Sequence, residues 1–181
     1  MIWLVAGLAI WWAAHLFKRI APERREGMGK TGKGLVAAAL IVALALMVVG
    51  YRMAESVAYW DPGAALVGIN NLFVLAAFYL FAASGLKTGV TRVIRHPQLV
   101  GFALWALAHI IVNGDLPSLV LFGGLLAWAL AEIAVINRAA PDWSAPEPVP
   151  ARKEVMAAVG AAAVFAAAAI VHGWLGYNPF G

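Results

Sequence analysis

The chain has 181 residues, of which 64% are hydrophobic and only 12% are charged, and its mean hydropathy is +0.85. About a quarter of the residues in soluble domains are charged, so this composition excludes an ordinary soluble domain and indicates a polytopic membrane protein in a lipid bilayer. The net charge of +4 does not indicate nucleic-acid binding, because the basic residues flank apolar segments and form no recognition motif.

Six apolar segments predict an all-α fold, a bundle of about six transmembrane helices. They are residues 2–17, 35–53, 64–86, 99–113, 116–136 and 155–176. Helices are expected because backbone polar groups in lipid must be satisfied within each segment, and no segment shows the alternation of a barrel strand. The first segment has no basic lead or cleavage motif, so we expect a retained helix rather than a signal peptide. We expect a single domain over residues 1–181.

The basic residues predict the orientation of the bundle. Twelve of the 13 Lys and Arg residues lie in the connections after the first, third and fifth segments, and only Arg52 lies on the other side. The positive-inside rule then places these three connections in the cytoplasm and both termini on the outer side of the membrane. We expect a basic, glycine-containing loop after the first segment and an extended, proline-rich loop over residues 139–154.

The chain has no cysteine, which excludes disulfides, iron–sulfur clusters, thiolate zinc sites and c-type haem. Imidazole remains as a ligand for a metal or cofactor, and each of the four histidines lies near or inside an apolar segment. They are His15, His96, His109 and His172. A histidine inside hydrocarbon is costly and marks a candidate functional site, the alternative being a hydrogen bond to a neighbouring helix.

Two of the histidines follow a tryptophan by four residues. The pairs are Trp11 with His15 and Trp105 with His109, and small alanines lie between the partners. In a helix this spacing puts the indole and the imidazole on one face. Such a face can pack against a flat apolar macrocycle whose iron binds the ring nitrogen. Periodicity alone favours the alternative, which is ordinary helix packing through small residues.

A longer set of residues resembles the NnrU family of bacterial membrane proteins. The set is Arg95-His96-Pro97-Gln98, Gly101, Trp105, Leu107-Ala108-His109, Asn113-Gly114-Asp115 and Leu121-Phe122-Gly123-Gly124, with His15 and Gly50-Tyr51-Arg52 in the same order of features. The resemblance covers most of the chain. It implies a role in nitrite and nitric oxide reduction during denitrification, with components of the nitrite or nitric oxide reductases as partners.

The NnrU family is related to plastid zeta-carotene isomerase, a haem b protein, which is similar to this chain in RHPQ and in the helix that ends in LAH. This resemblance implies haem b, with His15 and His109 as axial ligands beside Trp11 and Trp105. Releasing one of two imidazoles opens the iron to a substrate or a diatomic gas. Haem-dependent cis–trans isomerisation of a polyene substrate is the alternative function. Ala106 and Asn70-Asn71 stand where the isomerase has a cysteine and a further histidine.

Membrane depth favours a different grouping of the polar residues. With the N-terminus outside, His15 lies near the cytoplasmic end of its helix and His109 near the external end, about 10–15 Å apart in depth at 1.5 Å per residue. By depth, His109 groups with His172 and Asn70-Asn71 in the outer half. His15 groups with Arg95, His96 and Glu132 in the inner half. His172 is therefore the substitute axial ligand.

Two other classes of function stay open. RHP followed by a glycine and a small-residue helix is similar to membrane methyltransferases of the isoprenylcysteine carboxyl type, which bind S-adenosylmethionine. Arg95, His96, Glu132 and Arg138 would form that site, although the paired glutamates of those enzymes are missing here. The other class is a non-enzymatic protein that assists the assembly or the haem supply of a nitric oxide reductase, with the same histidines.

Overall fold

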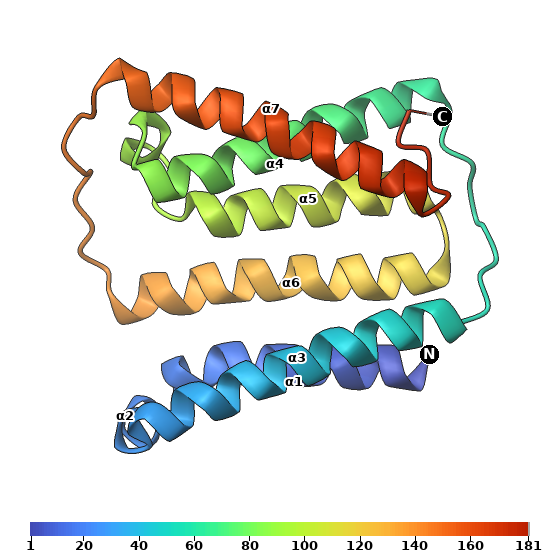
Figure 1. The fold of residues 1–181 in the computed structure, drawn as a ribbon. Helices are drawn as coiled ribbons and strands as arrows, with labels where there is room; N and C mark the ends of the chain where they lie inside the picture. The colour runs from blue at the N-terminus through green and yellow to red at the C-terminus, as the bar shows by residue number, and fades with distance from the viewer. Residues whose placement is uncertain (181) are drawn as a thin grey trace.

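The computed structural model describes residues 1–180, and over these residues it is helical, with one isolated β-bridge and no strand (Figure 1). The all-α prediction is confirmed. The elements are α1 (Ile2–Ile20), α2 (Pro22–Gly27), α3 (Gly29–Met53), α4 (Ala64–Leu86), the 3-10 helix η1 (Gly89–Arg92), α5 (Pro97–Asn113), α6 (Leu116–Ala139) and α7 (Ala151–Trp174).

Each of the six predicted segments lies almost wholly within one helix, but the helices differ in length. Four of them, α3, α4, α6 and α7, are long and apolar enough to span a membrane. Helix α5 is apolar but has only 17 residues, and the 19-residue α1 ends with Lys18 and Arg19 in its last turn. The chain therefore has membrane-spanning helices, and the presence of six transmembrane helices stays a prediction.

The connection after α1 is not the loop predicted from its glycines and basic residues. It contains the short helix α2, and α3 already begins at Gly29. Pro22 in the first turn of α2 suits a helix start, and Glu23 beside it interacts favourably with the helix dipole. Gly29 has a φ of 52°, which provides the break between α2 and α3. Residues 140–150 form a connection without helix, as predicted, but the predicted loop was too long, since residues 151–154 belong to α7.

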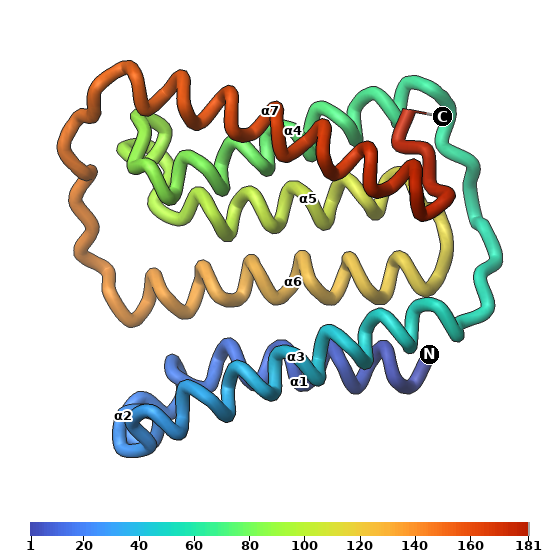
Figure 2. Tube along the Cα trace, viewed as in Figure 1, coloured from blue at the N-terminus to red at the C-terminus, as the bar shows by residue number. Residues whose placement is uncertain are grey.

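The long helices lie side by side in an order that differs from their order in the sequence. Helix α6 packs against α1 on one side and against α5 on the other (Figures 1 and 2). Helix α3 packs against α1, α4 against α5, and α7 against α4. The interface of α1 with α6 thus joins the N-terminal helix pair to the other four long helices.

Small residues let the helix backbones approach closely, as is common where helices pack in membranes. A Cβ added at Gly50 of α3 would lie 2.2 Å from the backbone nitrogen of Leu4 in α1. A Cβ added at Gly7 would lie 2.8 Å from the carbonyl oxygen of Ala43. Alanines make up most of the buried hydrophobic residues, among them Ala77, Ala83, Ala103, Ala106, Ala108, Ala129, Ala157 and Ala161. The packing of this bundle therefore depends on side-chain size more than on hydrophobicity.

The tight turn between α5 and α6 follows from three consecutive residues. Asn113 ends α5, Gly114 has a φ of 61°, and the Asp115 carboxylate accepts a hydrogen bond from the Ser118 backbone nitrogen at 2.7 Å as the N-cap of α6. A Cβ at Gly114 would also lie 2.5 Å from the Trp60 carbonyl oxygen. This turn fixes the antiparallel pairing of α5 and α6, and with it the position of the last turn of α5.

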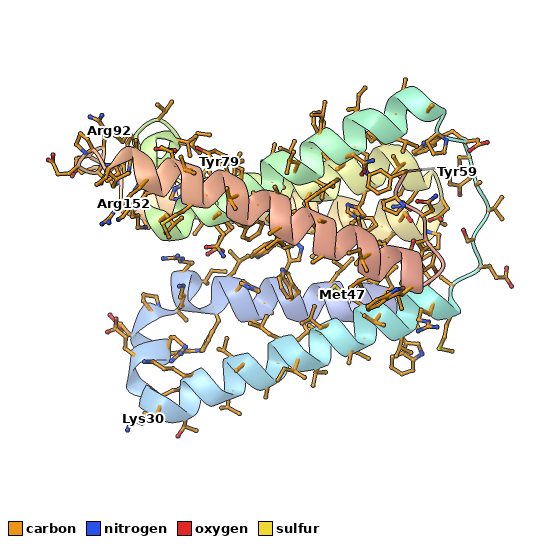
Figure 3. All side chains as sticks on the ribbon, turned by 45° about the horizontal axis from the view of Figure 1, so that its top comes forward. Lys30, Met47, Tyr59, Tyr79, Arg92 and Arg152 are labelled. Carbon is orange, nitrogen blue, oxygen red and sulfur yellow. The ribbon has the colours of Figure 1, made fainter. Side chains whose placement is uncertain are left out.

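The three basic connections lie at one end of the bundle, and both termini lie at the other end (Figure 1). Lys30, Arg92 and Arg152 mark the basic end, and Tyr59 lies at the opposite end (Figure 3). The structure thus brings together the twelve basic residues that the sequence grouped, and it leaves Arg52 at the other end of α3.

The segregation of charge generates a prediction about topology. Reporter fusions at Gly27, Thr88 and Ala145 should give a cytoplasmic signal, because the basic end stays on the cytoplasmic side. Fusions after Pro62 or at the C-terminus should give an external signal. Measuring an alkaline phosphatase and a fluorescent protein reporter at each site checks both halves of the prediction, and an external signal at Gly27 would contradict it.

The contact of α1 with α3 generates a second prediction. Gly50→Leu should reduce the free energy of unfolding by about 1–3 kcal/mol or more, because the new side chain meets backbone atoms of α1. This loss should be seen as a lower melting temperature of the purified protein. Gly68→Leu in α4 is the matched control, since no atom lies within 4 Å of a Cβ added there. Equal melting temperatures for the two variants would contradict the close packing of these helices.

Candidate functional site

A cavity of about 640 Å³ lies toward the end of the bundle opposite the basic connections. It is lined mainly by α4, α5 and α7, with residues from the end of α3, from α6 and from the chain after α7. The polar residues in its lining are Tyr51, Asp61, Asn70, Asn71, Asn113, His109, His172, Tyr177 and Asn178. The apolar part includes Trp105, Phe122 and Phe165. Cofactor and small-molecule sites have volumes of about 300–1,000 Å³ and a similar mixture of residues.

His109 and His172 line this cavity from two different helices, and their rings are held in the same way. Nδ1 of His109 lies 2.9 Å from the carbonyl oxygen of Trp105, and Nδ1 of His172 lies 2.8 Å from that of Ala168. A carbonyl oxygen only accepts hydrogen bonds, so Nδ1 carries the proton in both rings. The lone pair of a neutral ring is then on Nε2, the arrangement found in histidines that bind metals.

Aromatic rings surround the His109 imidazole on its own helix and on α6. The ring centroids of Trp105 and Phe122 lie 4.9 Å and 4.7 Å from that of His109. The predicted pairing of Trp105 with His109 on one helix face is therefore confirmed, and so is that of Trp11 with His15, whose ring centroids are 4.3 Å apart. These contacts restrict the imidazole of His109 to one orientation.

Asn70 and Asn71 of α4 lie in the same cavity as His109 and His172. In the orientation that satisfies its hydrogen bonds, the Asn70 amide donates to the carbonyl oxygen of Ala108 at 3.1 Å and so ties α4 to α5 beside His109. Asn71 donates to the carbonyl oxygen of Pro179 at 2.9 Å and holds the chain after α7 against the cavity. The structure thus brings together the four residues that membrane depth grouped in the outer half.

His15 lies in different surroundings, on α1 toward the basic end. Its Nδ1 bonds to the carbonyl oxygen of Trp11 at 3.0 Å, and its ring centroid lies 4.5 Å from that of Trp128 in α6. It is absent from the lining of the cavity. The rings of Trp11 and Trp128 both contact Phe102, and His109 lies seven residues beyond Phe102 along α5, about 10 Å at 1.5 Å per residue. The pair of His15 with His109 stays a prediction.

An ion pair joins α1 to α6 one turn from His15. Arg19 Nε lies 3.1 Å from Glu132 Oε1, and the Glu132 residue is only 5% exposed. The other carboxylate oxygen of Glu132 and the indole nitrogens of Trp11 and Trp128 are buried without a hydrogen-bond partner among residues 1–180. Because an unpaired buried polar group destabilises the folded state, loss of the Arg19 contact would weaken the α1–α6 interface.

The residues proposed for a methyltransferase site do not form one cluster. Arg95 and His96 line a separate pocket at the basic end, and neither Glu132 nor Arg138 is part of its lining. His96 Nε2 instead donates to the Asn137 side-chain oxygen at 2.9 Å, and Glu132 pairs with Arg19. Within residues 1–180 no group of three or more His, Asp or Glu side chains is placed to hold a metal ion. A haem iron needs only one or two protein ligands.

Two parts of the cavity were not predicted as site residues, although Tyr51 belongs to the set of residues that resembles the NnrU family. Tyr51 lines the cavity from the end of α3, and its hydroxyl lies 2.8 Å from that of Ser118 in α6. Residues 176–179 turn back after α7, and Gly176 has a φ of 88°. The glycine and proline of this segment predict a turn, but its position over the cavity depends on the packing of α7 against α4.

These features define an all-helical membrane protein with a histidine-lined cavity at one end of the bundle. The chain matches the NnrU protein family over residues 3–179, nearly its whole length, and therefore belongs to the NnrU family. No curated protein and no solved structure is detectably similar to it.

The ion pair generates a prediction about stability. Arg19→Gln should lower the free energy of unfolding by about 1–3 kcal/mol, because it leaves the buried Glu132 carboxylate without its partner. Glu132→Gln should have a smaller effect, because the unpaired Arg19 side chain is 30% exposed and can be solvated. Glu147→Gln, in the extended connection after α6, should have no effect. Melting temperatures of the three purified variants at neutral pH test this order, and the reverse order of the first two would contradict it.

Proposed function

We propose that this NnrU-family protein binds haem b in the cavity, with His109 as an iron ligand, and that it acts in nitrite or nitric oxide reduction. The observation that carries the proposal is that His109 and His172 line one cavity of about 640 Å³ and share the same ring tautomer. The denitrification role rests on the resemblance and the family, and the cavity by itself supports only the cofactor.

The residues of the cavity fit a haem in three respects. Each histidine donates a hydrogen bond from Nδ1 to a backbone carbonyl oxygen. This bond fixes the ring and leaves Nε2 to bind the iron. Trp105, Phe122 and Phe165 provide apolar surface for a flat macrocycle. Asparagine amides and tyrosine hydroxyls can donate hydrogen bonds to its polar edge. When bound, the haem would supply a redox centre or a position for a diatomic gas.

The second iron ligand has two candidates. His172 is supported by its place in the cavity and by its ring orientation, which matches that of His109. His15 is supported by the resemblance to the carotene isomerase. We favour His172, because it lines the same cavity as His109, whereas His15 lies outside that lining and packs against Trp11 and Trp128.

The test is the visible spectrum of the purified protein and of four single variants. The wild-type chain should show a b-type spectrum with two imidazole ligands. His109→Ala and His172→Ala should each abolish it or convert it while the protein still inserts into the membrane. His96→Ala is the matched control, because His96 lies at the other end of the bundle and bonds to Asn137, and it should leave the spectrum unchanged.

His15→Ala decides between the two candidate ligands. An unchanged spectrum in His15→Ala together with a lost spectrum in His172→Ala supports the pair in the cavity. The opposite result assigns the second ligand to His15. A folded, purified wild-type protein that binds no haem in either oxidation state would overturn the proposal as a whole.

A further inference from the structure

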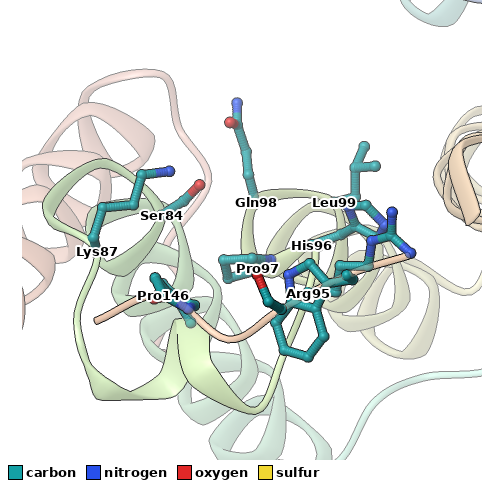
Figure 4. A pocket seen from close by; sticks show the side chains of 11 residues that line it. Ser84, Lys87, Arg95, His96, Pro97, Gln98, Leu99 and Pro146 are labelled. Atoms are coloured by element: carbon teal, nitrogen blue, oxygen red, sulfur yellow. The ribbon is translucent and has the colours of Figure 1, made fainter. Parts of the chain in front are cut away.

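A second pocket, of about 380 Å³, lies at the basic end of the bundle, where α4 ends, α5 begins and the connection from α6 to α7 crosses. Lys87 lies on one side of the pocket and Arg95 and His96 on the other, with Pro97 and Gln98 between them (Figure 4). Its other lining residues are Ser84, Thr91, Leu99, Trp143, Ser144 and Pro146. The cavity that carries the proposed function shares none of these residues.

The lining of the pocket carries positive charge and no carboxylate, and the neighbouring Glu154 carboxylate accepts hydrogen bonds from the Gly89 backbone N–H and the Tyr79 hydroxyl instead. The lining contains Lys87 and Arg95 but no aspartate or glutamate. The ion pair of Arg19 with Glu132 is the one salt bridge within residues 1–180, so neither pocket cation has an acidic partner. Arg95 donates to the carbonyl oxygen of Ala140, which holds its side chain without cancelling its charge. This environment attracts an anion.

The first turn of α5 adds backbone donors to the same pocket. The helix has no side-chain cap at its N-terminus, and it begins with Pro97, which has no N–H group. The N–H groups of Gln98 and Leu99 are among those that a helix leaves without an internal partner, and both residues line the pocket. Together with the helix dipole, they favour a phosphate group at this position.

Lys87 has a left-handed backbone conformation, which is uncommon for a residue with a side chain. It is the one non-glycine residue with a positive φ within residues 1–180, with a value of 61° at the end of α4. Glycine or asparagine is normally preferred at such a helix end. A lysine at this helix end interacts favourably with the helix dipole, and the same residue lines the pocket.

We propose that this pocket binds the phosphate group of an anionic phospholipid from the leaflet at the basic end of the bundle. Lys87 and Arg95 would contact the phosphate oxygens together with the N–H groups that begin α5. A lipid is favoured over a soluble phosphate compound because the pocket lies at the ends of the apolar helices α4 and α5 and includes Leu99 and the half-exposed Trp143. Tryptophans and basic pockets between helices are typical of lipid headgroup depth.

The test uses the full chain in a neutral detergent and measures its melting temperature during titration with dioctanoyl phosphatidylglycerol. The lipid should raise the melting temperature of the wild-type protein, because it binds the folded state. Dioctanoyl phosphatidylcholine has the same chains and a choline cation that Lys87 and Arg95 repel, so it should have a weaker effect. Raising the salt concentration should weaken the effect of phosphatidylglycerol.

Two variants and one control assign the effect to the pocket. Lys87→Asn, which tolerates the positive φ, and Arg95→Gln should each weaken the response to phosphatidylglycerol roughly ten-fold, because each removes a charged contact to phosphate. Lys30→Asn removes a basic residue at the same end but outside the pocket and should respond as the wild type does.

Equal responses of the wild type, Lys87→Asn and Arg95→Gln would overturn the proposal, since the effect would then be unspecific attraction to the basic end. Sodium phosphate that acts as strongly as phosphatidylglycerol at equal concentration would overturn the lipid assignment in favour of a soluble phosphate ligand. The shifts in melting temperature caused by lipid and by phosphate do not depend on haem content. They therefore test this pocket whatever the spectra of the histidine variants show.

Discussion

The absence of water in the hydrocarbon core is the constraint on which this structure depends. Polar side chains between the helices must find partners within the protein, and most of them find backbone carbonyls or polar groups on a neighbouring helix. The histidines of α1, α5 and α7 all bond through Nδ1 to the carbonyl oxygen four residues earlier. One local hydrogen bond thus satisfies one ring nitrogen and leaves the other for a ligand.

Aromatic packing separates the two ends of the bundle. Phe102 contacts Trp11 and Trp128 toward the basic end and Trp105 toward the cavity, so a continuous set of rings runs between the surroundings of His15 and those of His109. These rings fill the interior where α1, α5 and α6 meet. A large ligand therefore finds space beside His109, between α4, α5 and α7, and not between the two Trp–His pairs.

The two ends of the bundle have different chemistry as a result. The cavity has Asp61 as its one charged lining residue and is otherwise made of amides, hydroxyls, imidazoles and aromatic rings, which suits a bulky cofactor with an apolar body. The pocket at the basic end has two cations, no carboxylate in its lining and the start of a helix, which suits a small anionic group. Because they share no lining residue, the two sites can be tested one at a time.

The sequence by itself determined the helical class, the apolar segments, the grouping of the basic residues and the family, because each depends on local composition or on short motifs. It also predicted that Trp105 and His109 share one face, since helical spacing dictates it. Tertiary structure alone decided that α6 packs between α1 and α5, that Tyr51 and the chain after α7 reach the cavity, and that Arg95 lies apart from Glu132. These features depend on which alanine and glycine faces fit together at backbone distance, and such steric fits between distant segments leave no periodic trace in the sequence.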